Sequence, residues 1–313
     1  MKSNLSPGIK NLILLIAVAM MWSPSFLFIK VGLRGFEPVT FGMLRLLLAA
    51  LVMYAILRIR GKKLPRDGKT IFQIGLMALT ANAIPFILFP IGEMYAESGI
   101  AAIINSTTPV FTVIFAHIWL HDERLDIVNA TGIFFGVFGV GLMFVPTLEG
   151  GWEFNVVALG VLAFLGASAC YGISNIIAKR FLLSYDRQMV ATTQFIISTA
   201  VLVPVAFLFE SPFASTPDLA SGSSLLALAI IGTVLPYLLY YRFIASAGAT
   251  YVSFVTFIMP PIGIALGVVF LDEQLTWHAY AGCALILVSV MTVNNIRTIR
   301  RWLSTRKPGI TGG

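Results

Sequence analysis

The chain is 313 residues long, with 58% hydrophobic residues, 11% charged residues and a formal net charge of +7. Soluble domains usually carry about 25% charged residues, so this composition excludes a chain that folds mainly in water. The positive charge does not predict a nucleic-acid partner, because the basic residues gather in short segments between apolar stretches rather than along one surface.

Ten apolar stretches occupy most of the chain. A helix needs about 20 apolar residues to cross the hydrocarbon core of a bilayer. The ten stretches cover residues 11–31, 38–57, 70–92, 98–119, 126–146, 155–178, 188–209, 223–244, 250–271 and 276–296. Only short loops remain between them, so the sequence predicts an all-α integral membrane protein with ten transmembrane helices.

The stretch 11–31 is expected to stay in the mature protein. Lys2 and Lys10 precede it, as in a secretory signal peptide. The apolar run continues through residues 22–27 without a small-residue cleavage site behind it. The segment also has a counterpart in the second half of the chain, so its removal would break a repeat.

The two halves of the chain carry matching residues at a nearly constant shift. At a shift of 151 the pairs are Pro85–Pro236, Phe86–Tyr237, Phe89–Tyr240 and Pro109–Pro260; at 150 they are Asp122–Asp272, Glu123–Glu273 and Gly132–Gly282; at 149 they are Trp22–Tyr171, Lys30–Lys179 and Arg45–Gln194. This predicts a five-helix repeat over 1–146, an outer linker over 147–154, a second repeat over 155–296 and a basic cytoplasmic tail over 297–313. Because five is odd, the second repeat is predicted to be inverted, an arrangement typical of transporters.

The distribution of basic residues predicts the orientation. If the N-terminus is cytoplasmic, all of the 21 basic residues except Lys30, Arg34 and Arg45 fall on the cytoplasmic side. The loops on the other side carry acidic residues, namely Glu149, Glu153, Glu210 and Asp218. Basic residues concentrate in cytoplasmic loops, so both termini are predicted to lie in the cytoplasm.

Several motifs of the sequence, taken in order, resemble those of a known protein family. The motifs that carry the resemblance are WSPSFLFIK at 22–30, Phe41 with Arg45, Pro109, and Asp122-Glu123-Arg124-Leu125 in the first half, then Gly248-Ala249-Thr250, Pro260, Asp272-Glu273 and Gly282 in the second. In this order they are similar to ten-helix EamA-like transporters of the drug/metabolite transporter superfamily. Asp122 and Asp272 stand where that family usually has glycine. The resemblance implies export of small metabolites, such as amino acids, or of drugs, across a bacterial inner membrane.

One face of the predicted helix 70–92 suits a solute pocket. Asn82, Phe86 and Phe89, followed by Glu93, have the spacing of a single helical face. Their repeat counterparts begin with Thr233, Tyr237 and Tyr240. An aromatic face with polar tips fits a small amphipathic solute, while packing between helices is the alternative. We therefore take Asn82, Phe86, Phe89, Tyr237 and Tyr240 as candidate cavity residues.

Further polar or aromatic candidates lie on the helices predicted around the same path. They are Trp22 and Ser25 in 11–31, Asn105 and Thr108 in 98–119, and Tyr171 and Asn175 in 155–178. Polar groups within a bilayer need partners or water, so each either lines the path or joins two helices by a hydrogen bond.

Arg45 is a charged candidate within a predicted membrane helix. An intramembrane charge is a functional hypothesis by default, and a guanidinium suits a substrate carboxylate. The long side chain has two alternatives, which are to reach the headgroups or to pair with Glu37 or Glu93. Lys30 and Glu93 lie nearer helix ends, where a structural role is expected.

Prolines and glycines predict how the helices bend and pack. Pro85, Pro109, Pro236 and Pro260 are expected to kink their helices. The pairs Gly132/Gly136 and Gly263/Gly267 permit close helix approach, within one chain or between two. Assembly into a homo-oligomer therefore stays open.

The sequence favours no enzyme. His117 and Asp122 form an H-x4-D pattern like that of glycerolipid acyltransferases, but no phosphate-binding Gly-Thr-Arg element follows. The chain has no P-loop and no Cys/His cluster for zinc. Cys170 and Cys283 both lie in predicted membrane helices, where a thiol acts as a small apolar residue. We expect neither a metal nor another cofactor.

Together these features predict a membrane transporter that exports a small organic metabolite by alternating access. Its cavity is expected between the first, third, fourth, sixth, eighth and ninth helices, and its partners are the solute and membrane lipids. A lipid or lipid-headgroup translocator and a non-transporting membrane scaffold remain as alternatives.

Overall fold

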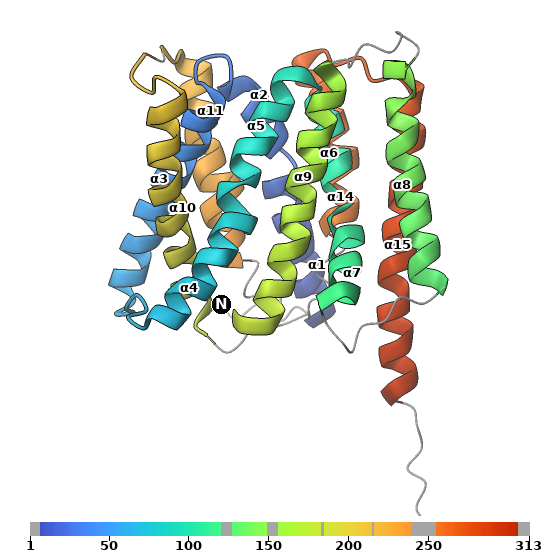
Figure 1. Ribbon diagram of the computed structural model, residues 1–313, viewed down its shortest axis with the longest axis horizontal. Coiled ribbons are helices and arrows are strands. Elements are labelled where there is room, and N and C mark those ends of the chain that lie inside the picture. Colours follow the sequence, from blue (N-terminus) through green and yellow to red (C-terminus); the bar gives the residue numbers. More distant parts are fainter. Residues whose placement is uncertain are drawn as a thin grey trace, which may run out of the picture.

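The computed structural model describes residues 7–119, 127–148, 156–182, 185–214, 216–239 and 255–305. All regular structure in these residues is helical (Figure 1). Seven helical segments are long and apolar enough to cross a membrane: Ile9–Gly32, Pro38–Ile59, Gly68–Tyr95, Ser98–Trp119, Val156–Ile177, Arg187–Phe209 and Leu219–Leu239. Shorter apolar helices at Ala130–Met143, Ile258–Leu271 and Trp277–Thr292 overlap the other three predicted stretches. The chain is an all-helical, multi-pass membrane protein.

The helices follow one another with short connections. In the first half they are α1 (Pro7–Trp22), α2 (Ser25–Gly32), α3 (Pro38–Ile59), α4 (Gly68–Ala78), the π-helical turn η1 (Leu79–Ala83), α5 (Pro85–Tyr95), α6 (Ser98–Asn105), α7 (Thr108–Trp119) and α8 (Ile127–Leu148). In the second half they are α9 (Val156–Ile177), η2 (Ala178–Leu182), α10 (Arg187–Phe209), α11 (Leu219–Ala229), η3 (Ile230–Val234), α14 (Val255–Leu271) and α15 (Trp277–Thr305).

Two helices that the sequence predicts as continuous are interrupted. The stretch 11–31 breaks between α1 and α2, where Pro24 lacks an N–H and the Ser23 hydroxyl donates to Ala19 O at 2.6 Å. The stretch 98–119 breaks between α6 and α7, where the Thr107 hydroxyl donates to Ile104 O at 2.6 Å. Pro109 lies at the start of α7, a position where a proline costs no helical hydrogen bond. Its predicted kink is therefore a full restart of the helix.

Helices distant in sequence pack in pairs, α2 on α11, α3 on α10, α5 on α9 and α6 on α14. The pair α8 and α15 stands at one side of the bundle (Figure 1). A Cβ added at Gly139 would lie 2.9 Å from Gly282 O, and one at Gly282 would lie 2.6 Å from Gly139 O. Small residues thus let these two backbones touch, as expected where lipid gives helices no hydrophobic reason to associate.

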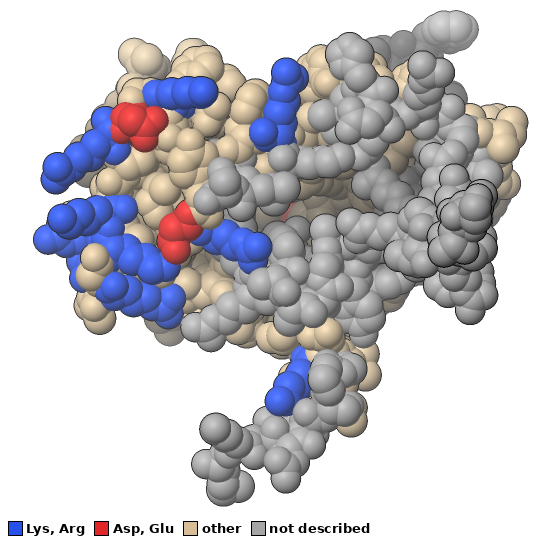
Figure 2. All heavy atoms as spheres, turned by 90° about the horizontal axis from the view of Figure 1, so that it is seen from below, with Lys and Arg blue, Asp and Glu red and all other residues tan. Residues whose placement is uncertain are grey.

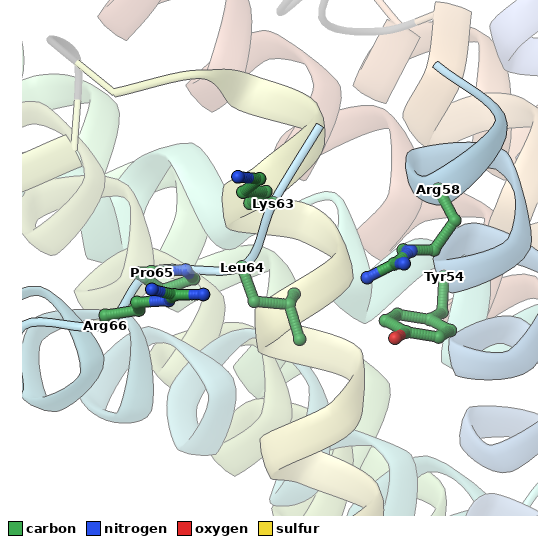
Figure 3. Close-up of a pocket in the computed structure, with 6 residues that line it drawn as sticks. All are labelled: Tyr54, Arg58, Lys63, Leu64, Pro65 and Arg66. Atoms are coloured by element: carbon green, nitrogen blue, oxygen red, sulfur yellow. The ribbon is translucent and has the colours of Figure 1, made fainter. Parts of the chain in front are cut away.

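One end of the bundle, lower in Figure 1, is rich in Lys and Arg, as Figure 2 shows from below. We call it the basic end. Lys62 pairs with Asp186 at 2.6 Å, and Arg60 donates to the Gln188 side chain at 3.0 Å. A cavity of about 220 Å³ here is lined by Tyr54, Arg58, Lys63, Leu64, Pro65 and Arg66 (Figure 3). These contacts join the α3–α4 connection to the start of α10.

Helices at the basic end begin with capping carboxylates. Asp67 accepts the Thr70 N–H at 2.8 Å, and Asp186 accepts the Met189 N–H at 3.0 Å. Each bond satisfies an N–H that has no partner within its own helix. The hydrogen bonds from Thr70 lower the pKa of Asp67, because they stabilise its charged form.

At the opposite end, two side chains hold the turn between α5 and α6. The Lys30 ammonium donates to the carbonyls of Glu93 and Ala96, the latter at 2.8 Å. The Glu273 carboxylate accepts the N–H groups of Ser98 and Gly99 at 2.7 and 3.0 Å. Cation and anion each meet the helix end of opposite partial charge. The first helical pair and the segment after α14 are thereby joined to one turn, which we call the Lys30–Glu273 clamp.

A second carboxylate at this end caps α3. Glu210 accepts the N–H groups of Val39 and Thr40 at 2.8 and 2.6 Å, and the Thr40 hydroxyl at 2.8 Å. In return, Glu37 accepts the Ser211 N–H at 3.0 Å. From the sequence, Glu210 is expected only as an acidic residue of a loop. Its position just after α10 does not reveal which distant helix it caps.

Asp272 has a left-handed backbone, with φ of 55°. This conformation costs most L-residues roughly 1–2 kcal/mol, and Asp and Asn tolerate it better than others. The turn places the next residue, Glu273, against Gly267 and the start of α6. The left-handed turn explains why a glycine suits this position.

Glu273→Ala should destabilise the protein strongly. It leaves two buried N–H groups without an acceptor, which we expect to cost about 2 kcal/mol or more. Glu273→Gln, which keeps one acceptor oxygen, should cost less. Thermal unfolding of purified protein in detergent measures both, with the exposed Gln274→Ala as control. Equal melting temperatures for Glu273→Ala and Gln274→Ala would contradict the clamp.

Asp272→Gly should stabilise the protein by about 0.5–1 kcal/mol, because glycine adopts the left-handed conformation without strain. Gly61 has φ of 67°, so Gly61→Ala should lower the melting temperature instead. Gln274→Gly, two residues from Asp272, separates the effect of conformation from that of adding a glycine. A loss of stability in Asp272→Gly as large as in Gln274→Gly would show that the turn is not strained.

Candidate functional site

Two π-helical turns face the centre of the bundle at equivalent positions of the repeat. They cover Leu79–Ala83 and Ile230–Val234, which are 151 residues apart. In each, an N–H reaches back five residues, from Ile84 to Leu79 O at 3.0 Å and from Leu235 to Ile230 O. A proline follows both turns and removes the N–H that would continue an α-helix. Such turns are frequent at functional sites.

Arg45 of α3 reaches the second of these turns. Its Nε donates to the Thr233 hydroxyl at 2.9 Å, and its guanidinium carbon lies 3.8 Å from the centre of the Phe86 ring. Thr233 in turn donates to Leu228 O at 2.9 Å. The Arg45 side chain is 8% exposed. The Thr233 hydroxyl on the π-helical turn and an aromatic face thus hold the guanidinium inside the bundle.

The first π-turn contacts α10 in the same way. The Gln194 amide donates to the Asn82 carbonyl oxygen, and the Asn82 amide donates to the Tyr237 hydroxyl at 3.3 Å. The Tyr237 ring meets Phe195 edge-on, with centroids 4.9 Å apart. We call Arg45, Thr233, Phe86, Asn82, Gln194 and Tyr237 the central network.

The two halves of the central network are related by the repeat. Gln194 matches Arg45 at a shift of 149, and Asn82 matches Thr233 at a shift of 151. The hydrogen bond from Arg45 to Thr233 and that from Gln194 to Asn82 therefore join equivalent positions. Tyr237, which matches Phe86, links the halves through Asn82.

The two structural alternatives considered for Arg45 do not describe its contacts. It is buried, and among the described residues it forms no ion pair with Glu37 or Glu93. Its hydrogen-bond partner, Thr233, lies 188 residues away in the π-helical turn η3. Among the described residues the only ion pair is Lys62–Asp186, so Arg45 has no paired carboxylate there. Its two terminal NH₂ groups also find no acceptor within the described part of the chain.

An aromatic cluster continues from Phe86 toward the clamp. Phe89 stacks on Phe164 and Tyr171 at 5.8 and 6.0 Å and meets Phe26 edge-on at 5.4 Å. Tyr171 is also close enough to Arg45 to interact electrostatically. The predicted face of Asn82, Phe86 and Phe89 is therefore buried, and Tyr171 lies beside it.

The other candidates divide into near and distant positions. Ser25 lies beside the second π-turn, since a Cβ added at Gly232 would be 3.1 Å from its hydroxyl. Trp22 packs against the main apolar core. Thr108 donates to Asn105 O at 2.8 Å within the α6–α7 break, and Asn175 is exposed and donates to Thr112 at 3.1 Å. The structure does not bring Asn105, Thr108 or Asn175 into the central network.

Some features of the sequence lie outside the described residues. Tyr240 is among them, and so is Asp122 of the H-x4-D pattern. His117 is described and lies exposed in the last turn of α7. Within the described ranges, no group of three His, Cys, Asp or Glu side chains is arranged to hold a metal ion.

Gln194 and Thr233 belong to the central network but are not among the candidate residues predicted from the sequence. The repeat could have identified both residues, because Gln194 is the counterpart of Arg45 and Thr233 is the counterpart of Asn82. The cavity prediction also omitted the two helices, α3 and α10, that carry Arg45 and Gln194. Helical periodicity identifies a face, but it cannot show which distant helix that face meets.

Asn82→Ala and Gln194→Ala should have coupled effects on stability. Each loss is expected to cost roughly 1 kcal/mol, a usual value for a hydrogen bond between membrane helices. The double variant should cost less than the two single losses together, because the first loss already breaks their shared bond. Thermal unfolding of all three variants measures the coupling. Asn82→Ala combined with Ser223→Ala, on the exposed side of α11, should be additive; additivity in both pairs would contradict the bond.

A known protein family matches the chain twice, once in each half. The model of the EamA-like transporter family matches residues 9–145 and again residues 158–295. An uncharacterized transporter of Archaeoglobus fulgidus is 25% identical over 285 residues, covering 91% of this chain and 98% of that protein. The uncharacterized inner membrane transporter YedA of Escherichia coli K12 is 22% identical over 296 residues, covering 94% and 92%.

Two further similarities bear on activity and fold. A probable terminal-alkyne amino-acid exporter of Streptantibioticus cattleyicolor is 24% identical over 295 residues, covering 94% of this chain and 96% of that protein. A crystal structure with a TM-score of 0.65 and 17% identity covers 94% of this chain and 98% of its own, which establishes a shared fold. With both halves matched by one family model, the chain belongs to the EamA-like transporter family.

Proposed function

We propose that this protein exports a small organic metabolite, of the amino-acid type, through the central network by alternating access. The observation that carries the proposal is the pair of equivalent polar contacts, Arg45 to Thr233 and Gln194 to Asn82, buried inside an apolar bundle. Polar groups in hydrocarbon are costly and usually mark a solute or ion path. Membership of a transporter family and the named exporter among the relatives support the same function.

The proposed architecture has ten transmembrane helices in two inverted five-helix repeats, 1–146 and 155–296. A linker over 147–154 joins them, and 297–313 form a tail. The two family matches and the paired π-turns support this division. In transporters of this design, solutes bind at broken helices near the bilayer midplane, where the repeats meet.

The proposed orientation places the basic end in the cytoplasm, with both termini, in a bacterial inner membrane. Figure 2 shows Lys and Arg outnumbering Asp and Glu among the coloured residues of that end, and cytoplasmic loops are enriched in basic residues. The name of the relative YedA supports the membrane. The Lys30–Glu273 clamp then lies at the outer end of the solute path.

The clamp supports an alternating mechanism. Lys30 and Glu273 come from opposite ends of the chain and hold one turn by four hydrogen bonds. Between the clamp and the central network lie the rings of Phe89, Phe164 and Tyr171. With the clamp formed, the outer end is sealed; its release, together with the rings parting, opens the network outward.

Arg45 is the proposed carboxylate-binding residue. A guanidinium presents its NH₂ groups in a fork that fits a carboxylate, and those of Arg45 have no acceptor among the described residues. Tyr237 and Asn82 offer neutral hydrogen-bonding groups beside it. The remaining candidates are proposed to line the solute path outside the central network. They are Trp22, Ser25, Phe89, Asn105, Thr108, Tyr171, Asn175 and Tyr240.

A transport assay tests the function. Purified protein in liposomes is loaded with one unlabelled solute from a panel of amino acids, nucleosides or cationic drugs, and uptake of the labelled solute is measured. Counterflow of one chemical class is the expected result. Scrambling of labelled lipids without solute counterflow would instead indicate a lipid translocator. If the protein shows neither solute counterflow nor lipid scrambling, and binds no solute, a membrane scaffold would be indicated.

Asn82→Ala and Tyr237→Phe should each lower counterflow about tenfold or more, while folded protein persists in size-exclusion chromatography. Each removes a polar group that we place in the solute site, and such losses are costly in buried sites. Ser223→Ala, on the exposed side of α11, is the matched control and should retain transport. Unchanged flux in the first two variants would contradict the proposed site.

Arg45→Gln puts the residue of the repeat counterpart into the first half. It should reduce transport of solutes that carry a carboxylate by about tenfold or more, with a smaller effect on neutral solutes. Counterflow of matched carboxylate and amide forms measures the difference. Equal loss for both forms would assign Arg45 a structural role.

A further inference from the structure

Glu93 is a buried carboxylate that the described residues leave without a hydrogen-bond donor. Its side chain is 1% exposed, and both carboxylate oxygens lack a hydrogen-bond partner within the described ranges. Its position near the end of α5 predicted a structural role, yet the side chain forms no hydrogen bond with a described residue that would hold the structure together. Buried carboxylates are normally paired or hydrogen-bonded, because removing their charge from water is costly.

The cations nearby are engaged elsewhere. Lys30 donates to the backbone carbonyls of Glu93 and Ala96 and holds the end of α5. Arg45 donates to Thr233 and lies over Phe86. The charged side chains close enough to act on Glu93 electrostatically are Lys30, Glu273 and Arg45.

The position of Glu93 relates it to Arg45. Asn82, Phe86, Phe89 and Glu93 lie on one face of the η1–α5 segment, and the Arg45 guanidinium covers Phe86. Seven residues separate Phe86 from Glu93, about 10 Å at 1.5 Å per residue. Phe89 lies between them and stacks on Tyr171. The Arg45 guanidinium and the Glu93 carboxylate, which has no hydrogen-bond donor among the described residues, therefore lie at the two ends of an aromatic wall.

We propose that Glu93 binds the positively charged group of a dipolar solute whose carboxylate is bound by Arg45. The inference rests on the proposed function and names the chemistry of its substrate. An ammonium supplies up to three N–H donors, which suits two carboxylate oxygens with no donor. The span of about 10 Å between the levels of the two poles accommodates two charge-assisted hydrogen bonds with an amino acid between them. The aromatic wall packs against the solute's apolar part.

The test compares solutes that differ by one charged group. L-Phenylalanine, 3-phenylpropionate and phenethylamine form one series; L-leucine, 4-methylpentanoate and isopentylamine form the other. Counterflow into liposomes, and thermal stabilisation by each compound, are measured for wild type and for Glu93→Gln. Wild type should prefer the amino acids. Glu93→Gln should lose about tenfold or more of its apparent affinity for the amino acids and the amines, while the carboxylates change little.

Two variants keep the test specific. Glu97→Gln makes the same charge change four residues away, just before the start of α6, and should leave the preference intact. Burial and the nearby Glu273 carboxylate raise the pKa of Glu97. Glu93→Asp keeps the charge and should restore part of the preference for the amino acids. It also serves if Glu93→Gln fails to give folded protein.

The outcomes separate this inference from the proposed function. Equal losses for all six compounds in Glu93→Gln, or loss only of a dependence on a proton gradient, would overturn the ammonium assignment. A wild type that transports other organic solutes but no amino acid overturns it as well, and leaves only the transport of a small organic solute from the proposed function. A wild type that transports no organic solute contradicts the proposed function itself.

Discussion

The structure depends on the cost of leaving a polar group without a partner in hydrocarbon. Water is absent from the membrane core, so every N–H, carbonyl and charge there must be satisfied by the chain or by a solute. Arg45 is the group for which this requirement is most severe. Its contacts with Thr233 and Phe86 use an irregular turn of one distant helix and the ring of another. The fold around the centre is arranged to hold this guanidinium.

The same requirement explains the ends of the helices. The N–H groups at the starts of α3 and α6 are met by Glu210 and Glu273, which come from distant parts of the sequence. The carbonyls at the end of α5 are met by Lys30. Each bond closes a helix end near the membrane surface and also joins segments far apart in the chain. Capping and tertiary structure are therefore one set of contacts here.

The broad architecture can be predicted from the sequence, whereas most contacts between distant residues cannot. Apolar length predicted the membrane helices, and the repeat pairs Pro85 with Pro236, each of which follows a π-helical turn in the structure. The periodicity of Asn82, Phe86 and Phe89 placed them on one helical face and predicted a solute pocket there, and the structure buries all three side chains. The periodicity could not show that Arg45 meets Thr233, because that pairing depends on how two helices 188 residues apart pack. The breaks at Ser23 and Thr107 depend on local hydroxyl bonds that hydropathy does not register.

Glu93 is a second residue whose surroundings the sequence does not reveal. Sequence placed it near a helix end, where a carboxylate usually meets water or a lysine. The structure puts it on the buried face that also carries Phe86 and Phe89, with Lys30 turned to the backbone instead. Whether a residue near a helix end is satisfied depends on its neighbours in space. Burial combined with a missing donor therefore distinguishes Glu93 from Glu97, its neighbour in the sequence.

The most direct test of the central claim is an experimental structure of the protein with a transported solute bound. The account predicts solute density within hydrogen-bonding distance of the Arg45 guanidinium, bordered by Asn82, Phe86 and Tyr237. A solute bound elsewhere, with the contacts of Arg45 to Thr233 and of Gln194 to Asn82 unchanged, would show that the central network only holds the helices together.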